Sequence, residues 1–228
     1  MNIYCTHFKS TVEDAARFCD RRSMLPILTR CRLKTGDNAL IIEATDLDKR
    51  FMRVIPVTGD LSFDILVPIE RLLKIAKHAT GTTLALDYAD KVLRFSGDLS
   101  FSIPIDGDVD DFPACPDFAE TLSIPALPKQ FFAHLATVLP FTDDIRTNRA
   151  YAGVLVDPAQ GIEEGLSLVA TDIHRVSVLT LKGMQVPCPF VIPSPAIPAL
   201  EKLFSDSAPL GITLAREHAP ETPRGEGD

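Results

Sequence analysis

The chain has 228 residues, 46% of them hydrophobic, which is enough for two ordinary domains with buried cores. Its net charge of −8 argues against a uniformly basic nucleic-acid binder, yet six acidic residues between positions 106 and 120 carry most of that charge and leave room for a local basic surface. Five scattered cysteines without a C-x-x-C spacing, no signal pattern and no apolar run of membrane length predict a soluble, cytoplasmic protein with reduced thiols and no membrane partner.

The first half of the chain predicts two helices among seven strands. A capping box at residues 10–13 predicts a helix start, and Val12, Ala15 and Cys19 continue its apolar stripe. A second helix is expected from Pro68, because proline is tolerated in the first helical turn. Alternating apolar residues predict strands near 27–34, 39–45, 49–57, 62–67, 82–87, 91–96 and 99–105.

The second half follows an acidic, proline-stiffened linker within residues 106–120. It predicts one helix from about 128 to 139 and another that opens at Ser194 and Pro195. Residues 216–228 contain nothing that could pack into a core, so they are predicted to form a disordered tail. Strands are expected near 151–157, 166–171, 174–182 and 210–215.

Two landmarks of the first half return in the second half in the same order. Ala-Thr-Asp-Leu at 44–47 returns as Ala-Thr-Asp-Ile at 170–173, and each copy follows an apolar, strand-like run. Each copy also precedes an apolar residue and a proline that open a helix, at 67–68 and at 192–193. A repeat with such a long period indicates duplicated domains.

The repeat predicts two α+β domains, residues 1–117 and 118–215, each with two helices packed on an antiparallel curved sheet. The first copy has three predicted strands after its second helix, whereas the second copy has one. The second domain is therefore predicted to be incomplete, with the strand at 210–215 at the edge of a sheet.

Several motifs resemble the bacterial DNA polymerase III beta subunit, the sliding clamp. They are Met-Leu-Pro-Ile-Leu at 24–28, Asp-Phe-Pro-Ala-Cys-Pro at 111–116 and Ala-Thr-Asp-Ile-His-Arg at 170–175, which is similar to the family's A-T-D-G-H-R motif. The resemblance covers about residues 1–215 and implies a duplicated DNA-clamp domain. The family's chains carry three such domains and form a dimeric ring around duplex DNA. This chain resembles a shortened form without the third domain and the end of the second, and it has Ile173 in place of the usual glycine.

The resemblance implies contacts with duplex DNA that do not depend on base sequence. Long cations on the polar side of the helix after Pro68 would reach phosphates, although a solvated helix face is the simpler interpretation. Arg149 stands one place after the position at which the family carries its arginine. The predicted DNA contacts are Arg22, Arg71, Lys74, Lys77, Arg146 and Arg149.

The resemblance also implies one wall of a groove that binds short peptides of DNA polymerases and clamp loaders. A strand-connecting turn with Asp172 as turn former is the alternative, and the first copy favours it because Thr45 and Asp46 stand there without His-Arg. The predicted peptide contacts are Tyr151, Thr171, Asp172, Ile173, His174, Arg175, Val176 and Pro193.

Catalysis is not expected. Asp172 and His174 lie near Ser177, but the chain has no G-x-S-x-G elbow, no phosphate-binding glycine loop and no H-E-x-x-H motif. Cys5 and His7 lack a second ligand pair, so neither a metal nor another cofactor is expected.

Two functions remain open. The first is a sliding-clamp-like processivity factor that encircles or contacts duplex DNA as a homo-oligomer, such as a trimer of two-domain chains, and tethers a polymerase through the peptide groove. The second is a truncated, non-ring module that captures such peptides without retaining DNA.

Overall fold

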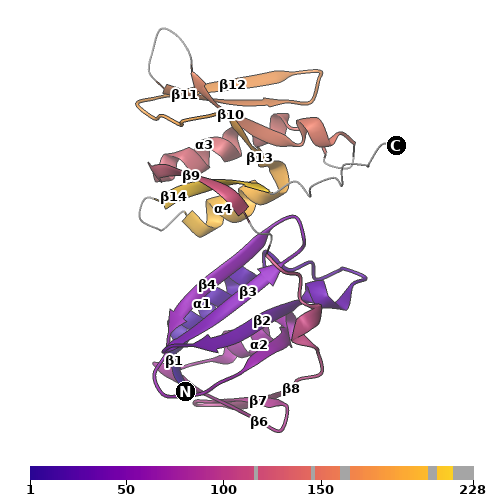
Figure 1. Cartoon of the computed structure of the whole chain (residues 1–228), viewed down its shortest axis with the longest axis vertical. Helices are drawn as coiled ribbons and strands as arrows, with labels where there is room; N and C mark the ends of the chain where they lie inside the picture. The colour runs from indigo at the N-terminus through magenta and orange to yellow at the C-terminus, as the bar shows by residue number, and fades with distance from the viewer. Residues whose placement is uncertain (116–117, 145–146, 160–164, 205–209, 218–228) are drawn as a thin grey trace, which may run out of the picture. The chain divides into compact units, whose positions relative to one another are not determined.

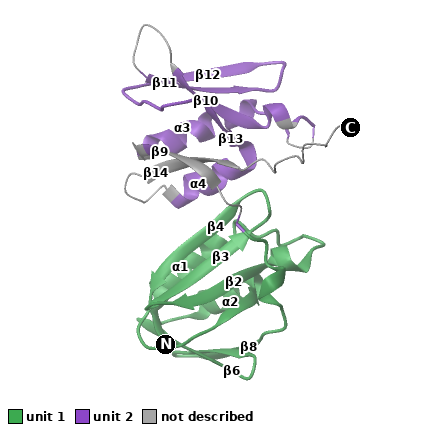
Figure 2. Cartoon of the chain, in the orientation of Figure 1, with its two compact units in different colours: residues 1–114 green, residues 115–228 purple. Residues whose placement is uncertain are grey.

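The computed structural model describes residues 1–115, 118–144, 147–159, 165–204 and 210–217. The chain forms two compact units, residues 1–114 (unit 1) and residues 115–228 (unit 2) (Figure 2). Both units combine two helices with antiparallel sheets, so the α+β class predicted from the sequence is confirmed.

Unit 1 contains two four-stranded antiparallel sheets, with strand orders β4-β3-β2-β5 and β1-β6-β7-β8. Its two helices pack on each other and cover one face of the first sheet (Figure 1). Phe8 and Leu72, from the two helices, and Leu33 and Phe95, from the two sheets, are fully buried in the core. The elements are β1 (Asn2–Tyr4), α1 (Cys5–Ala15), β2 (Arg30–Gly36), β3 (Ala39–Thr45), β4 (Arg50–Pro56), β5 (Asp64–Pro68), α2 (Ile69–His78), β6 (Thr83–Ala89), β7 (Val92–Ser96) and β8 (Ser100–Pro104).

Unit 2 contains a four-stranded sheet of order β12-β11-β10-β13 and a two-stranded sheet of β14 and β9. Its helices α3 and α4 pack on each other. Phe131 and Leu135 of α3 are fully buried in one apolar cluster with Val154, Leu168 and Ile197. The elements are β9 (Phe118–Leu127), α3 (Lys129–Val138), β10 (Gly153–Ala159), β11 (Gly165–Thr171), β12 (Val176–Lys182), β13 (Phe190–Pro193), α4 (Ile197–Phe204) and β14 (Leu210–Glu217).

The two units repeat the same topology. The order β4-β3-β2-β5 of unit 1 matches β12-β11-β10-β13 of unit 2, and the pair β1 and β6 matches β9 and β14. The predicted duplication of one fold is therefore confirmed. In unit 1 the second sheet continues through β7 and β8, whereas in the described part of unit 2 only β9 pairs with β14.

The capping box predicted at residues 10–13 is wrong. Helix α1 begins at Cys5 after Tyr4, and Ser10 lies inside the helix, where its hydroxyl donates to the His7 carbonyl at 3.2 Å. The buried stripe of Phe8, Thr11, Val12 and Ala15 extends the helix toward its N-terminus, and burial outweighs the local cap signal.

Other differences concern short elements and boundaries. The sequence pattern did not predict β1 and β13, which have only three and four residues and so show little alternation. It also did not predict the ten-residue strand β9, whose first residues fall in the stretch expected to be a linker. Strand β14 continues to Glu217, so the tail predicted from residue 216 is wrong at its first two positions, and residues 218–228 lie outside the described residues.

Candidate functional site

The solvent side of α2 carries three cations. Ile69, Leu72, Ile75 and Ala76 are buried, and this spacing leaves positions 71, 74 and 77 on the opposite side of the helix. Arg71, Lys74 and Lys77 are all exposed, and none of them forms an ion pair with another described residue. Side chains three residues apart on a helix are neighbours, so the three charges form a continuous basic face, which we call the α2 basic face.

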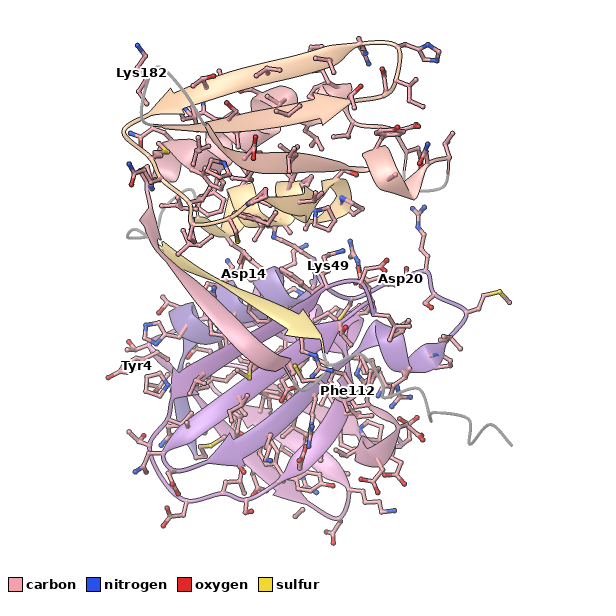
Figure 3. The ribbon with its side chains drawn as sticks, turned by 45° about the horizontal axis from the view of Figure 1, so that its top comes forward. Tyr4, Asp14, Asp20, Lys49, Phe112 and Lys182 are labelled. Atoms are coloured by element: carbon pink, nitrogen blue, oxygen red, sulfur yellow. The ribbon has the colours of Figure 1, made fainter. Side chains whose placement is uncertain are left out.

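Arg22 lies in the loop next to α2. The preceding residue, Arg21, donates to the Glu70 carboxylate at 3.1 Å, and this contact ties the loop to the first turn of α2. The backbone N–H of Arg22 donates to the carboxylate of Asp20 at 3.1 Å, and the Arg22 side chain is exposed (Figure 3 labels Asp20). The structure therefore brings Arg22 and the α2 basic face to one region of unit 1.

The other two predicted DNA contacts belong to unit 2. Arg149 opens the short 3-10 turn Arg149–Tyr151 before β10. Arg146 lies outside the described residues.

The turn at 171–175 of unit 2 is held by its own side chains. The Thr171 hydroxyl donates to the Arg175 carbonyl at 2.9 Å and accepts from the Ile173 N–H at 3.1 Å. The Asp172 carboxylate accepts from the backbone N–H groups of His174 and Arg175, at 3.2 and 3.0 Å, and from Nε of Arg175 at 2.9 Å. The hydrogen bond from the Arg175 guanidinium is the main reason that the pKa of Asp172 lies below its ordinary value.

Arg175 also contacts residues of unit 2 outside the turn. Its guanidinium donates to the Pro140 carbonyl at 2.9 Å and lies 5.1 Å from the centre of the Phe141 ring. Asp172 and Arg175 therefore fix the turn, and His174 and Ile173 present exposed side chains at its tip.

Unit 1 contains the same turn. The Thr45 hydroxyl donates to the Lys49 carbonyl at 2.9 Å and accepts from the Leu47 N–H at 3.1 Å. Asp46 accepts from the Lys49 N–H at 2.9 Å and forms an ion pair with its ammonium group (Figure 3 labels Lys49). Lys49 thus takes the place of Arg175, a correspondence that the sequence alone does not show because the first copy lacks the His-Arg pair.

Both turns place an apolar residue in a left-handed conformation. Leu47 has φ of 79° and Ile173 has φ of 76°, and their relative exposures are 62% and 64%. A β-branched residue is unfavourable at positive φ, so the Ile173 backbone is strained.

The remaining predicted peptide contacts gather at the same end of the unit 2 sheet. Thr171 pairs with Val176 across β11 and β12, and Pro193 pairs with Gly153 across β13 and β10. Val176 and Pro193 are exposed. Tyr151, 38% exposed, lies just before β10.

The described residues contain no group of three or more His, Cys, Asp or Glu side chains arranged to hold a metal ion. Among the same residues, no helix is long and apolar enough to cross a membrane.

Comparison with known proteins gives a consistent result. Residues 1–116 match the family model of the DNA polymerase III beta subunit, N-terminal domain. No curated protein sequence matches the chain significantly.

Similar solved structures include Caulobacter crescentus pol III beta, with 22% identity, a TM-score of 0.81, and coverage of 95% of this chain and 60% of that one. The DNA polymerase sliding clamp of Bacillus subtilis has 20% identity, a TM-score of 0.77, and coverage of 94% and 59%. The Helicobacter pylori beta clamp bound to a DNA ligase peptide has 20% identity, a TM-score of 0.73, and coverage of 90% and 59%. The chain thus spans about 60% of the length of these proteins.

Proposed function

This chain belongs to the DNA polymerase III beta subunit family, and on that premise we propose that it is a sliding-clamp-like processivity factor in DNA replication, acting in the cytoplasm. It contacts duplex DNA through unit 1 and tethers a DNA polymerase or a clamp loader through a peptide site on unit 2. The family is that of a non-catalytic processivity factor, which agrees with the prediction that the chain is not an enzyme.

The α2 basic face is the observation that carries the DNA part of this proposal. Three exposed cations that form no ion pair with a described carboxylate, with Arg22 nearby, can contact a row of phosphates but are not arranged to recognise bases. The pKa of Asp106 lies below its ordinary value mainly because of Arg30, and the charge of Arg71 adds a smaller contribution. The acidic net charge of the whole chain does not oppose this, because repulsion from distant carboxylates is screened at physiological salt, and the nearby carboxylate of Asp106 is already paired with Arg30.

Replacing the α2 cations tests the DNA contact. We expect the triple variant Arg71→Gln, Lys74→Gln, Lys77→Gln to lower the salt dependence of duplex binding, with a loss of about 0.9 in the slope of log K against log salt for each phosphate contact removed. Fluorescence anisotropy of a labelled duplex over a salt series measures that slope.

A matched control removes the same charge elsewhere on unit 1. The triple variant Lys34→Gln, Lys91→Gln, Arg94→Gln changes cations on β2, on β7 and in the turn before β7. Equal losses in the two triple variants would mean that net charge alone governs binding and that α2 is not the contact.

The exposed tip of the 171–175 turn supports the peptide part. His174 and Ile173 are free to meet a ligand, while Thr171, Asp172 and Arg175 hold the backbone that presents them. The beta clamp of H. pylori has been seen with a DNA ligase peptide, which supports a short peptide as the class of partner. With that peptide as a fluorescent probe, we expect His174→Ala to weaken binding, and equal affinity for both proteins would remove His174 from the site.

Encircling DNA requires several copies of a two-unit chain, and we propose a trimer. The alternative, a non-ring module that captures peptides without retaining DNA, is favoured by one observation: β14 is paired only with β9 in the described part of unit 2. The two assemblies differ in molar mass and in retention on circular DNA.

A further inference from the structure

One row of aliphatic side chains crosses the whole outer face of the unit 2 sheet. Its four members stand directly opposite one another in register: Val191 pairs with Leu155, Leu155 with Val169, and Val169 with Val178. Each strand contributes one residue. At about 4.8 Å between neighbouring strands, the row is roughly 14 Å long.

The row is not part of the core. The alternate residues Val154, Val156 and Leu168 point to the other face and are fully buried there. Val178 and Val191, by contrast, are 59% and 56% exposed. Apolar surface of this kind, continuous over four strands, is typical of an interaction site when it is bounded by polar groups.

Its borders differ on the two sides. On one side lie Ser167 and Thr180, whose hydroxyl oxygens are 3.4 Å apart. On the other side lie Thr171 and Val176, the next cross-strand pair toward the turn, so the row continues directly into the proposed peptide site. A Cβ on Gly153 would come within 2.6 Å of Cγ1 of Val191, so the missing side chain lets the Val191 side chain lie over the backbone of β10.

Unit 1 provides an internal control, because the same positions of the same sheet hold different residues. There the row reads Leu66, Arg32, Glu43 and Met52. Arg32 donates two hydrogen bonds to Asp64, at 2.8 and 2.7 Å, and Glu43 accepts one from Arg50 at 3.0 Å. The same fold therefore accommodates charged residues in the centre of this row, so the fold itself does not demand aliphatic residues at the two central positions.

The size of the row indicates its occupant. Four aliphatic side chains, two of them only partly exposed, fall well short of the ~800 Å² that each partner contributes to a standard protein interface. A second copy of the chain would need more surface than this, whereas a short extended peptide needs only a few well-placed apolar contacts.

We propose that the row Val191, Leu155, Val169 and Val178 is a second apolar subsite that receives an aliphatic or aromatic side chain of a linear peptide whose other part engages the 171–176 end of the sheet. This inference rests on the proposed peptide-binding function. The row would give the peptide an apolar contact that neither the 171–175 turn nor the residues next to it provide.

The test uses the double variant Val178→Thr, Val191→Thr. Threonine keeps the β-branched shape and the strand preference but makes the row polar, so the sheet is expected to stay folded. Anisotropy with the labelled DNA ligase peptide should show binding about tenfold weaker than for the unsubstituted chain. The matched control, Met52→Thr on the equivalent strand of unit 1, should bind the peptide unchanged.

Alanine substitution in the peptide completes the cycle. For one apolar residue of the peptide, alanine substitution should weaken binding to the unsubstituted chain but not to the double variant, because the surface that it contacts has been removed. Light scattering on the same samples shows whether the variant changes the mass of the chain instead of its peptide affinity.

Each outcome has a separate meaning. Unchanged affinity in the double variant, together with weaker binding by His174→Ala, overturns the subsite but keeps the peptide function. A fall in mass with unchanged affinity identifies a second copy as the occupant. No binding by the unsubstituted chain overturns the proposed function and the subsite with it.

Discussion

At the scale of single residues, hydrogen bonding explains why the Thr-Asp pair occurs in both units. In each unit the threonine hydroxyl and the aspartate carboxylate satisfy the backbone of one tight turn, and a cation three residues after the aspartate completes it. The motif was visible in the sequence. Its closing cation was not recognised as shared, because Lys49 and Arg175 differ in type and only the structure shows that they occupy the same place.

The strained backbone at Ile173 leads to the first prediction at this scale. Ile173→Gly should raise the free energy of unfolding of unit 2 by about 0.5–1 kcal/mol, since relief of the left-handed conformation exceeds the extra chain entropy of glycine. Urea denaturation measures the change, and Leu47→Gly in unit 1 should give a similar gain. A loss of stability in Ile173→Gly would show that its side chain makes contacts that outweigh the strain.

The ionisation of Asp172 gives the second prediction. Its pKa lies below the ordinary value because Arg175 donates hydrogen bonds to it. A lowered folded pKa stabilises the turn above the ordinary aspartate pKa of about 3.9, and this contribution is lost as the pH falls through the lower folded value. The backbone amide signals of His174 and Arg175, followed by NMR, should therefore shift with a midpoint below about pH 3.9. A midpoint at or above that pH would exclude the pairing.

At the scale of elements, apolar periodicity predicts the long helices better than the strands, since the ten-residue strand β9 was not expected. Helix α3 begins and ends within about a residue of its predicted bounds, and helix α2 begins one residue after Pro68, because their apolar stripes and the adjacent prolines agree. Helix α1 was misplaced because a cap pattern at Ser10 competed with a buried stripe that starts earlier. The aliphatic row of unit 2 could not be found from sequence, because its members come from four strands and only the register aligns them.

The packing of α3 supplies a prediction at this scale. Leu135 is fully buried in the unit 2 cluster, so Leu135→Ala should destabilise unit 2 by about 2–5 kcal/mol through lost burial and a cavity. Urea denaturation followed by circular dichroism measures the loss. The exposed Thr137 on the same helix serves as control: Thr137→Ala raises helix propensity and removes no buried side chain, so it should not destabilise unit 2, and a comparable loss there would contradict the packing explanation.

At the scale of the whole chain, the two units share one duplicated fold but differ in the residues on their surfaces. The two units share a topology and a turn, but unit 1 carries the α2 basic face and a charged sheet face, while unit 2 carries an aliphatic sheet face. One fold thus carries the surface proposed for DNA and a separate surface proposed for a peptide. This division supports a tethering role, since a tether needs two independent contacts.

Assembly is the prediction that belongs to the whole chain. We expect light scattering to give a trimer of the 24.9 kDa chain whose mass stays constant over a wide concentration range, because a closed ring has no free interface left to add further copies. A monomer at every concentration would favour the non-ring module.

Retention on DNA tests the central proposal most directly. The chain is assembled on a nicked circular duplex, washed at moderate salt, and compared with the same duplex after linearisation by a restriction enzyme. The proposed sliding clamp predicts that the protein remains on the circle and is lost from the linear form, because a ring slides off free ends. Equal loss from both forms would contradict encirclement and leave a module that binds peptides without retaining DNA.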